Sequence, residues 1–195
     1  MHFVVFSPGR TGSQLIANNI RHHYKCAVVH THNPMYNPLC QSVAIISKRR
    51  NMFNALMSAF VSQISGEFFS YTANTIYKVT IPNDAFRNRY IFYKVFYEIV
   101  NLNYFDRVID IFYEDMVNDA TYLFSQFGVD KDIAMQLSPK SPYDYSYITN
   151  IDQLRILYDE YEKTPLSSEI IENVKWSIEK DLLEIRTKYN GNKPI

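Results

Sequence analysis

The sequence has few cysteines, no long apolar run and no excess charge, and each absence excludes a class of protein. Cys26 and Cys40 form no metal-binding pattern with nearby histidines, so no metal site is expected, and so few thiols favour a reducing compartment. No stretch approaches the roughly 20 apolar residues that cross a bilayer. Met1 leads into the first expected strand without a signal peptide. A soluble, cytoplasmic protein without a membrane span is therefore expected.

Charge and length narrow the class further. Twenty basic and twenty acidic residues cancel, so no overall field attracts nucleic acid, and no nucleic-acid partner is expected. The 195 residues suit a single domain, residues 1–195, with one core. Aromatic residues make up 15% of the chain, which indicates either an aromatic-rich core or a stacking surface for an adenine or an aromatic substrate.

The start of the chain predicts a buried strand, a tight loop and a helix. Residues 3–6 are apolar and rich in β-branched and aromatic side chains, as in a strand covered on both faces. Ser7-Pro8-Gly9 ends this strand, and an apolar-periodic segment begins at Ser13 and continues to about Tyr24. The helix expected there directs the free N–H groups and the positive end of its dipole at the loop.

The loop has the composition of an oxyanion site. Gly9 and Gly12 permit backbone angles that other residues avoid, and Arg10 carries a planar, permanent charge suited to phosphate or sulfate. An ATP-type loop requires a lysine directly before the hydroxyl residue, whereas here Gly12 precedes Ser13. An ordinary ATPase or GTPase is therefore disfavoured, and a plain turn between strand and helix remains the alternative.

Three further strands are expected, at residues 26–31, 42–47 and 107–112. The third of the four strands ends in a basic run, and a helical pattern follows from Met52. Arg50 and Ser58 lie eight positions apart, which places them about 80° apart around a helix. One ligand group is therefore within reach of both side chains.

The rest of the chain is mostly helical in pattern. Residues 75–81 read either as a strand or as part of a lid over the acceptor. A long helix is expected from Pro82-Asn83-Asp84, with an aromatic stripe that belongs mostly to the core. Further helices are expected at 122–127 and 130–137, from a capping box at Asn150 to Lys163, and from Ser167 to about Tyr189. The stripe comprises Phe86, Tyr90, Tyr93, Tyr97 and Val100.

Four short motifs, in family order, resemble those of sulfotransferases. Pro8-Gly9-Arg10-Thr11-Gly12-Ser13 resembles the 5′-phosphosulfate loop P-[KR]-[ST]-G-[ST], with Gly9 inserted. His30-Thr31-His32 before Pro34 resembles K-T-H-x-P, Arg50 with Ser58 resembles R-(x)7-S, and Phe112-Tyr113-Glu114-Asp115-Met116 resembles F-Y-E-D-[LM]. The resemblance covers roughly residues 2–128, and the family's late motif R-K-G-x-x-G is absent.

This resemblance implies a three-layer α/β/α fold of the P-loop-NTPase-like type, with a central parallel sheet and a helical C-terminal part. It implies 3′-phosphoadenosine 5′-phosphosulfate (PAPS) as donor and 3′,5′-adenosine bisphosphate (PAP) as product. Lys140 and Ser141 are the candidates to replace the missing late motif at the 3′-phosphate. The other implied nucleotide-binding residues are Ser7, Pro8, Gly9, Arg10, Thr11, Gly12, Ser13, Gln14, Arg50, Ser58 and Tyr113, the last beside the adenine.

In the implied reaction an acceptor hydroxyl or amine attacks sulfur, His32 removes its proton, and Arg10 with the loop N–H groups stabilises the leaving oxygen. The acceptor is a small molecule, a carbohydrate or a peptide, and the oligomeric state stays open. Residues 65–93 are expected to cover the acceptor, or else to pack simply on the sheet edge. The alternatives are a solvent-facing His32, a nucleotide or nucleoside kinase-like phosphotransferase, and a non-catalytic nucleotide-binding protein.

Overall fold

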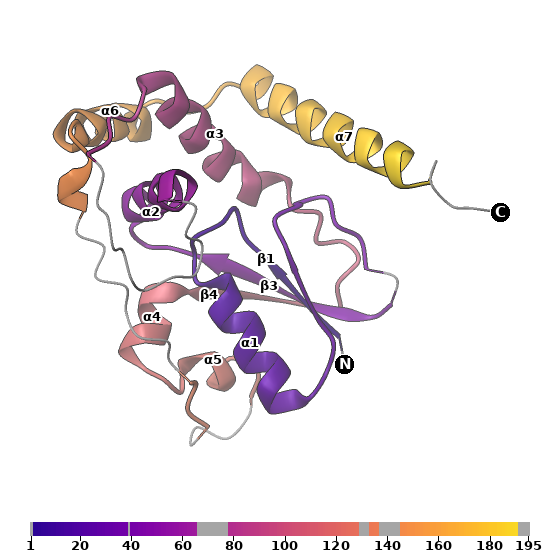
Figure 1. The fold of residues 1–195 in the computed structure, drawn as a ribbon. Coiled ribbons are helices and arrows are strands. Elements are labelled where there is room, and N and C mark those ends of the chain that lie inside the picture. The colour runs from indigo at the N-terminus through magenta and orange to yellow at the C-terminus, as the bar shows by residue number, and fades with distance from the viewer. Residues whose placement is uncertain (1, 39, 66–77, 129–132, 137–144, 191–195) are drawn as a thin grey trace.

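The computed structural model describes residues 2–38, 40–65, 78–128, 133–136 and 145–190, arranged around one parallel sheet (Figure 1). The sheet contains β1 (His2–Phe6), β2 (Val28–Thr31), β3 (Ser42–Lys48) and β4 (Arg107–Phe112), in the order β2-β1-β3-β4. The four expected strands are confirmed, although β2 begins at Val28 rather than Cys26. Because all four are parallel, the loops that follow them emerge at one edge.

Helices cover both faces of this sheet (Figure 1). On one face lie α1 (Ser13–Tyr24), α4 (Tyr113–Asn118) and α5 (Tyr122–Ser125), packed on alternate strand residues such as Val5 and Ile45. The intervening residues Val4 and Ile46 face the other side, where they pack against Phe96 of α3 (Asn83–Ile99). The prediction of an α/β fold, with a central parallel sheet and helices on both faces, is confirmed.

A second apolar cluster lies beyond the sheet, between α2 (Met52–Ser65), α3 and α6 (Ile151–Lys163). Phe86, Tyr90 and Tyr93 of α3 are buried, which confirms that most of the aromatic stripe belongs to the core. The last helix, α7 (Ser168–Asn190), contacts α3 and lies on the outside of this layer (Figure 1). Within the described ranges no helix has the length and apolar character needed to span a membrane.

The prediction of a helix at residues 130–137 is wrong for its described part, since residues 133–136 are not helical. Their backbone N–H groups bond elsewhere: Met135 donates to the Ala120 carbonyl oxygen at 2.8 Å, and Gln136 donates to Asn19 Oδ1 at 2.7 Å. The helix predicted at 122–127 ends at Ser125. Residues 133–136 therefore hold the chain against α1 instead of forming a helix.

The helix expected after Asn150 is confirmed, and Asn150 is its N-cap residue, but the side-chain bonds of the predicted capping box are not formed. The Asn150 side chain accepts from Ile81 N–H at 3.1 Å and donates to the Ile81 carbonyl at 2.9 Å. Val79 forms a single bridge with Ile148 rather than part of a strand. Residues 66–77, which belong to the segment 65–93 predicted to cover the acceptor, lie outside the described residues.

Candidate functional site

The predicted oxyanion loop connects β1 to α1 at the carboxyl edge of the sheet. Its backbone enters the left-handed region three times, with φ of 107° at Gly9, 52° at Arg10 and 83° at Gly12. Arginine rarely adopts such an angle, so the surrounding contacts must hold it there. Pro8 is buried at the start of the loop. The sequence-based prediction of a tight loop at residues 7–13 is therefore confirmed, and the shape of this loop depends on its neighbours.

A chain of buried hydroxyl groups supplies part of that support. Ser7 Oγ lies 2.9 Å from Thr11 Oγ1 and accepts the Gly9 N–H at 2.9 Å. Thr11 Oγ1 donates to Ser47 Oγ at 2.8 Å, and Ser47 Oγ donates to the Thr11 carbonyl at 2.8 Å. The side chains of Ser7 and Thr11, predicted to bind nucleotide, thus hydrogen-bond within the loop and to the end of β3. Sequence reasoning missed Ser47, whose only signal is its place at the end of a buried strand.

Two tyrosines of α3 hydrogen-bond to the loop and to β3. The Tyr93 hydroxyl donates to the Gly9 carbonyl at 2.8 Å, and the Tyr97 hydroxyl donates to the Ser47 carbonyl at 3.0 Å. Burial raises the pKa of Tyr93 to about 12, and Arg89, Arg10 and Arg49 act against this rise. Tyr93 therefore stays protonated and keeps its hydrogen bond to the loop throughout the physiological pH range.

Arg10 contacts Ser58, a residue that the sequence had paired with Arg50. Arg10 Nε donates to Ser58 Oγ at 3.0 Å, and the Ser58 side chain is buried in α2. The loop after β1 and the helix after β3 therefore meet at these two predicted site residues. A guanidinium and a hydroxyl are both groups that bind phosphate or sulfate oxygens.

Arg50 is engaged elsewhere. Its guanidinium binds Asp115 through two contacts, Nε to Oδ1 at 3.1 Å and Nη2 to Oδ2 at 2.7 Å, and it stacks on Phe112 with Cζ 4.4 Å from the ring centroid. Its backbone N–H donates to Glu114 at 3.0 Å. The Asp115 hydrogen bonds, followed by the charge of this carboxylate, raise the pKa of Arg50. The structure thus joins β3 to the start of α4 through Arg50, and places Ser58 with a different arginine.

Tyr113, predicted to lie beside the adenine, packs against the loop. A Cβ added to Gly12 would stand 2.4 Å from Tyr113 Cδ2, so the ring packs directly on the loop backbone. On the ring lies the guanidinium of Arg49, whose Cζ is 3.9 Å from the centroid. Arg49 was not among the predicted site residues, although it stands next to Arg50 in the basic run.

His32 reaches the loop from the end of β2. Its Nδ1 lies 2.7 Å from the Ser7 carbonyl oxygen. Because a carbonyl oxygen only accepts, Nδ1 carries the proton, and neutral His32 keeps its lone pair on Nε2. The side chain is exposed, so an incoming molecule has access to the ring. A neutral imidazole oriented in this way has the form that a general base needs.

His30 differs from its neighbour. Its Nε2 lies 2.8 Å from Ser13 Oγ, at the first residue of α1. Burial, followed by the charges of His32 and Arg21, lowers the pKa of His30 to about 4. His30 is therefore neutral at pH 7, a weak base and a fixed partner of Ser13. Gln14, also predicted to bind nucleotide, donates to Asn18 Oδ1 along α1 at 2.8 Å.

The low pKa of His30 predicts a loss of stability in acid. The unfolded chain takes up a proton near pH 6.5, and the folded protein does so only near pH 4, so the free energy of unfolding falls as the pH drops between these values. We expect a loss on the order of 1–2 kcal/mol, because solvent reaches part of the ring. Urea unfolding at pH 7 and 4.5 measures it. His30→Gln should show a smaller pH dependence, and an unchanged dependence in this variant would contradict the assignment.

Lys140 and Ser141 lie outside the described residues. In the part of the chain that the structure describes, no group of three or more His, Cys, Asp or Glu side chains is placed to hold a metal ion.

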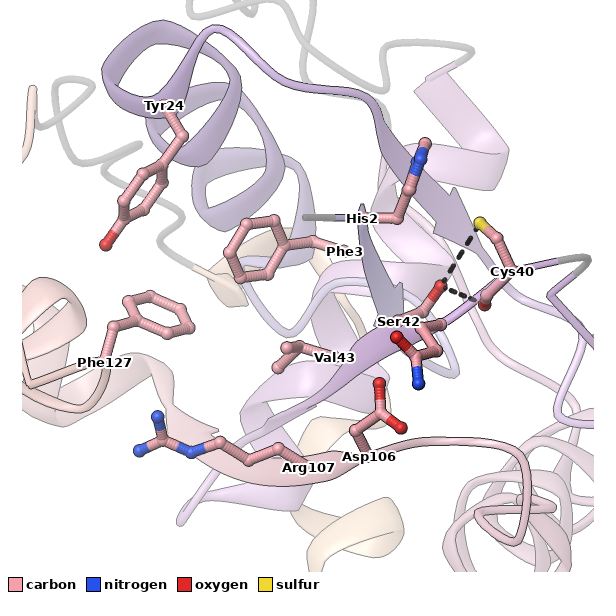
Figure 2. A pocket seen from close by; sticks show the side chains of 10 residues that line it. His2, Phe3, Tyr24, Cys40, Ser42, Val43, Asp106, Arg107 and Phe127 are labelled. Carbon is pink, nitrogen blue, oxygen red and sulfur yellow. Dashed lines mark hydrogen bonds between the residues drawn. The ribbon is translucent and has the colours of Figure 1, made fainter.

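A separate hollow of about 710 Å³ lies at the opposite edge, where β1, β3 and β4 begin (Figure 2). Its lining includes the ring of Phe3, with the ring centroids of Tyr24 and Phe127 5.5 and 5.4 Å from that of Phe3. The charged residues Asp106 and Arg107 also line it. None of the predicted site residues that the structure describes lines this hollow. No motif in the sequence predicts this hollow, because its walls come from segments far apart in the chain.

Comparison with protein-family models, with curated protein sequences and with solved structures finds no significant match to this chain.

Proposed function

We propose that the protein transfers a sulfuryl group from PAPS to an acceptor hydroxyl or amine and releases PAP. The observation that best supports this proposal is the contact between Arg10 and Ser58, which are 48 positions apart in the chain. His32 is hydrogen-bonded to the same loop. One edge of the sheet thus holds a guanidinium, a helix N-terminus and a candidate base. The resemblance of the four motifs to those of sulfotransferases implies PAPS as the donor.

The space directly beside Gly9 is nearly free of other described atoms. Among the described residues, a Cβ built on Gly9 would find only the Tyr93 hydroxyl within 4 Å, at 3.6 Å. The left-handed backbone there leaves the main chain open to a ligand oxygen. The N–H groups in the first turn of α1 have no acceptors within the helix, and they favour negative charge. Gly9, Arg10, Gly12 and Ser58 are therefore the residues that would hold the donor.

The donor, when bound, supplies an electrophilic sulfur joined through a bridging oxygen to the 5′-phosphate. His32 Nε2 takes the proton from the acceptor as the acceptor oxygen or nitrogen forms its bond to sulfur. The bond between sulfur and the bridging oxygen breaks, and its electron pair remains on the phosphate of PAP. Arg10 and the N–H groups of α1 stabilise this negative charge, and positioning contributes much of the rate.

One contact favours this reaction over phosphoryl transfer by a kinase. In ATP-binding loops the hydroxyl residue at the start of the helix binds Mg²⁺. Here the corresponding Ser13 hydroxyl lies 2.8 Å from His30 Nε2. An uncharged imidazole in hydrogen-bond contact with that oxygen occupies one side of the place where the metal ion would bind.

Calorimetry with PAP and with ATP plus magnesium tests the proposal. We expect PAP to bind more tightly, and we expect Ser58→Ala to weaken PAP binding about 2- to 10-fold, because one hydrogen bond is lost. The matched control is Ser62→Ala, one turn further along α2, since the Ser62 hydroxyl donates only to the Ser58 and Ala59 carbonyls of its own helix.

Tighter binding of ATP, with turnover that requires magnesium, would instead support the kinase-like alternative. Tight binding of PAP without turnover on any acceptor tested would support a non-catalytic nucleotide-binding protein.

A further inference from the structure

Arg49 and Arg50 are adjacent in sequence, but their surroundings differ. The Arg50 side chain is 58% exposed. Its guanidinium hydrogen-bonds to Asp115 and stacks on the ring of Phe112. The Arg49 side chain is only 19% exposed and lies on the ring of Tyr113, which itself packs against the oxyanion loop. The resemblance to sulfotransferases concerns Arg50 alone, and it gives Arg49 no role.

The hydrogen bonds of Arg49 are incomplete. Its Nε atom is buried, yet none of the described residues accepts a hydrogen bond from it. Its described acidic neighbour is Glu114, with Nη1 3.8 Å from Oε1, which is too long for a hydrogen bond. The other Glu114 oxygen already accepts the Arg50 N–H. Leaving a buried charged donor without an acceptor is unfavourable, so an incoming oxygen at this point would be stabilised.

Arg49 and Arg10 act on the same point of the structure. Arg10 belongs to the loop itself, and Arg49 packs on Tyr113, whose ring would meet a Cβ added to Gly12 of the same loop. Both arginines also lower the pKa of the Tyr93 hydroxyl, against the larger effect of burial. That hydroxyl donates to the Gly9 carbonyl at the middle of the loop. Two guanidinium groups beside one loop favour a ligand that carries negative charge.

We propose that Arg49, rather than Arg50, is the arginine of this strand end that binds a ligand oxyanion, and that Arg49 and Arg10 together select ligands carrying two phosphate or sulfate groups. The Arg49 guanidinium lies on the Tyr113 ring, with Cζ 3.9 Å from the centroid, and this contact restrains the planar fork beside the loop. Arg50 then has a structural role, joining β3 to α4 through Asp115. The inference rests on the proposed function for the nucleoside part of the ligand, but not for the oxyanions.

Adjacent matched variants test this assignment. Calorimetry with inorganic pyrophosphate and with PAP compares the wild-type protein, Arg49→Gln and Arg50→Gln. Because a charge-assisted hydrogen bond is lost, we expect Arg49→Gln to weaken both probes about 10- to 150-fold. Arg50→Gln should change either affinity by less than about threefold, since it removes only an exposed ion pair. If Arg49→Gln does not fold, as judged by circular dichroism, Arg49→Lys replaces it.

Arg49→Lys keeps the charge but lacks Nε and the planar fork, so we expect an affinity between those of the wild type and Arg49→Gln. The inference is overturned if Arg50→Gln has the larger effect, if the Arg49 variants bind as the wild type does, or if the wild type binds neither probe. Pyrophosphate binding that depends on Arg49, without any preference for PAP, would uphold this inference while contradicting the proposed function. The two failures are therefore distinguishable.

Discussion

Replacing His32 with alanine is expected to slow sulfuryl transfer by about 10²–10⁴-fold while leaving the affinity for PAP nearly unchanged. The reason is the orientation of the ring: Nδ1 donates to the Ser7 carbonyl, so Nε2 is the atom left to accept a proton. The measurement is the release of PAP from PAPS with any hydroxyl or amine compound on which the wild-type protein is active, together with calorimetry of PAP.

A second substitution separates the base from the loop contact. The amide of His32→Asn retains a donor for the Ser7 carbonyl but has no basic nitrogen, so we expect its turnover to fall as far as that of His32→Ala. His22→Ala, on the exposed side of α1, is the control and should have full activity. Full activity in His32→Ala would place the base elsewhere. The resemblance motif would then leave His30, whose low pKa makes it a poor substitute.

Gly12→Ala is expected to destabilise the protein by about 2–5 kcal/mol and to abolish PAP binding. Two effects combine: a φ of 83° is unfavourable for any residue with a Cβ, and that Cβ would stand 2.4 Å from Tyr113 Cδ2. The clashing atom belongs to a ring packed against Arg49, so relief requires both side chains to move. Thermal or urea unfolding measures the loss of stability, and calorimetry measures the loss of binding.

Gly128→Ala provides the matched control for this prediction. Gly128 also has a left-handed backbone, with φ of 75°, but nothing described lies within 4 Å of an added Cβ. Its substitution should therefore cost about 1–2 kcal/mol, the backbone effect alone. If Gly12→Ala is no more destabilising than Gly128→Ala, Tyr113 does not pack on the loop as the structure has it.

The strands and the loop were predictable because their signals are local. Buried parallel strands are short apolar runs, and Gly9 and Gly12 mark a tight turn between β1 and α1. The helix predicted at residues 130–137 was wrong for a non-local reason: its backbone bonds to Asn19 and Ala120. No periodicity within the segment reveals a partner more than one hundred residues away.

The candidate site shows the same limit at the level of side chains. The spacing of Arg50 and Ser58 predicted that one ligand group reaches both side chains. In the structure the Arg50 guanidinium instead binds Asp115. Ser58 contacts Arg10 instead. The sequence thus identified most of the strand ends that build the site, but not the pairing of their side chains, which depends on contacts formed only when the sheet is assembled.

The two tyrosines of α3 limit the insertions and deletions that this helix tolerates. Tyr93 and Tyr97 stand four residues apart, about 6 Å along the helix axis. Their hydroxyls bind the carbonyl of Gly9, in the loop after β1, and the carbonyl of Ser47, in the neighbouring strand β3. Inserting or deleting one codon between them would turn one hydroxyl by about 100° and break its contact. Homologous sequences can therefore differ on the outer face of α3, but they must keep the same number of residues between these two tyrosines.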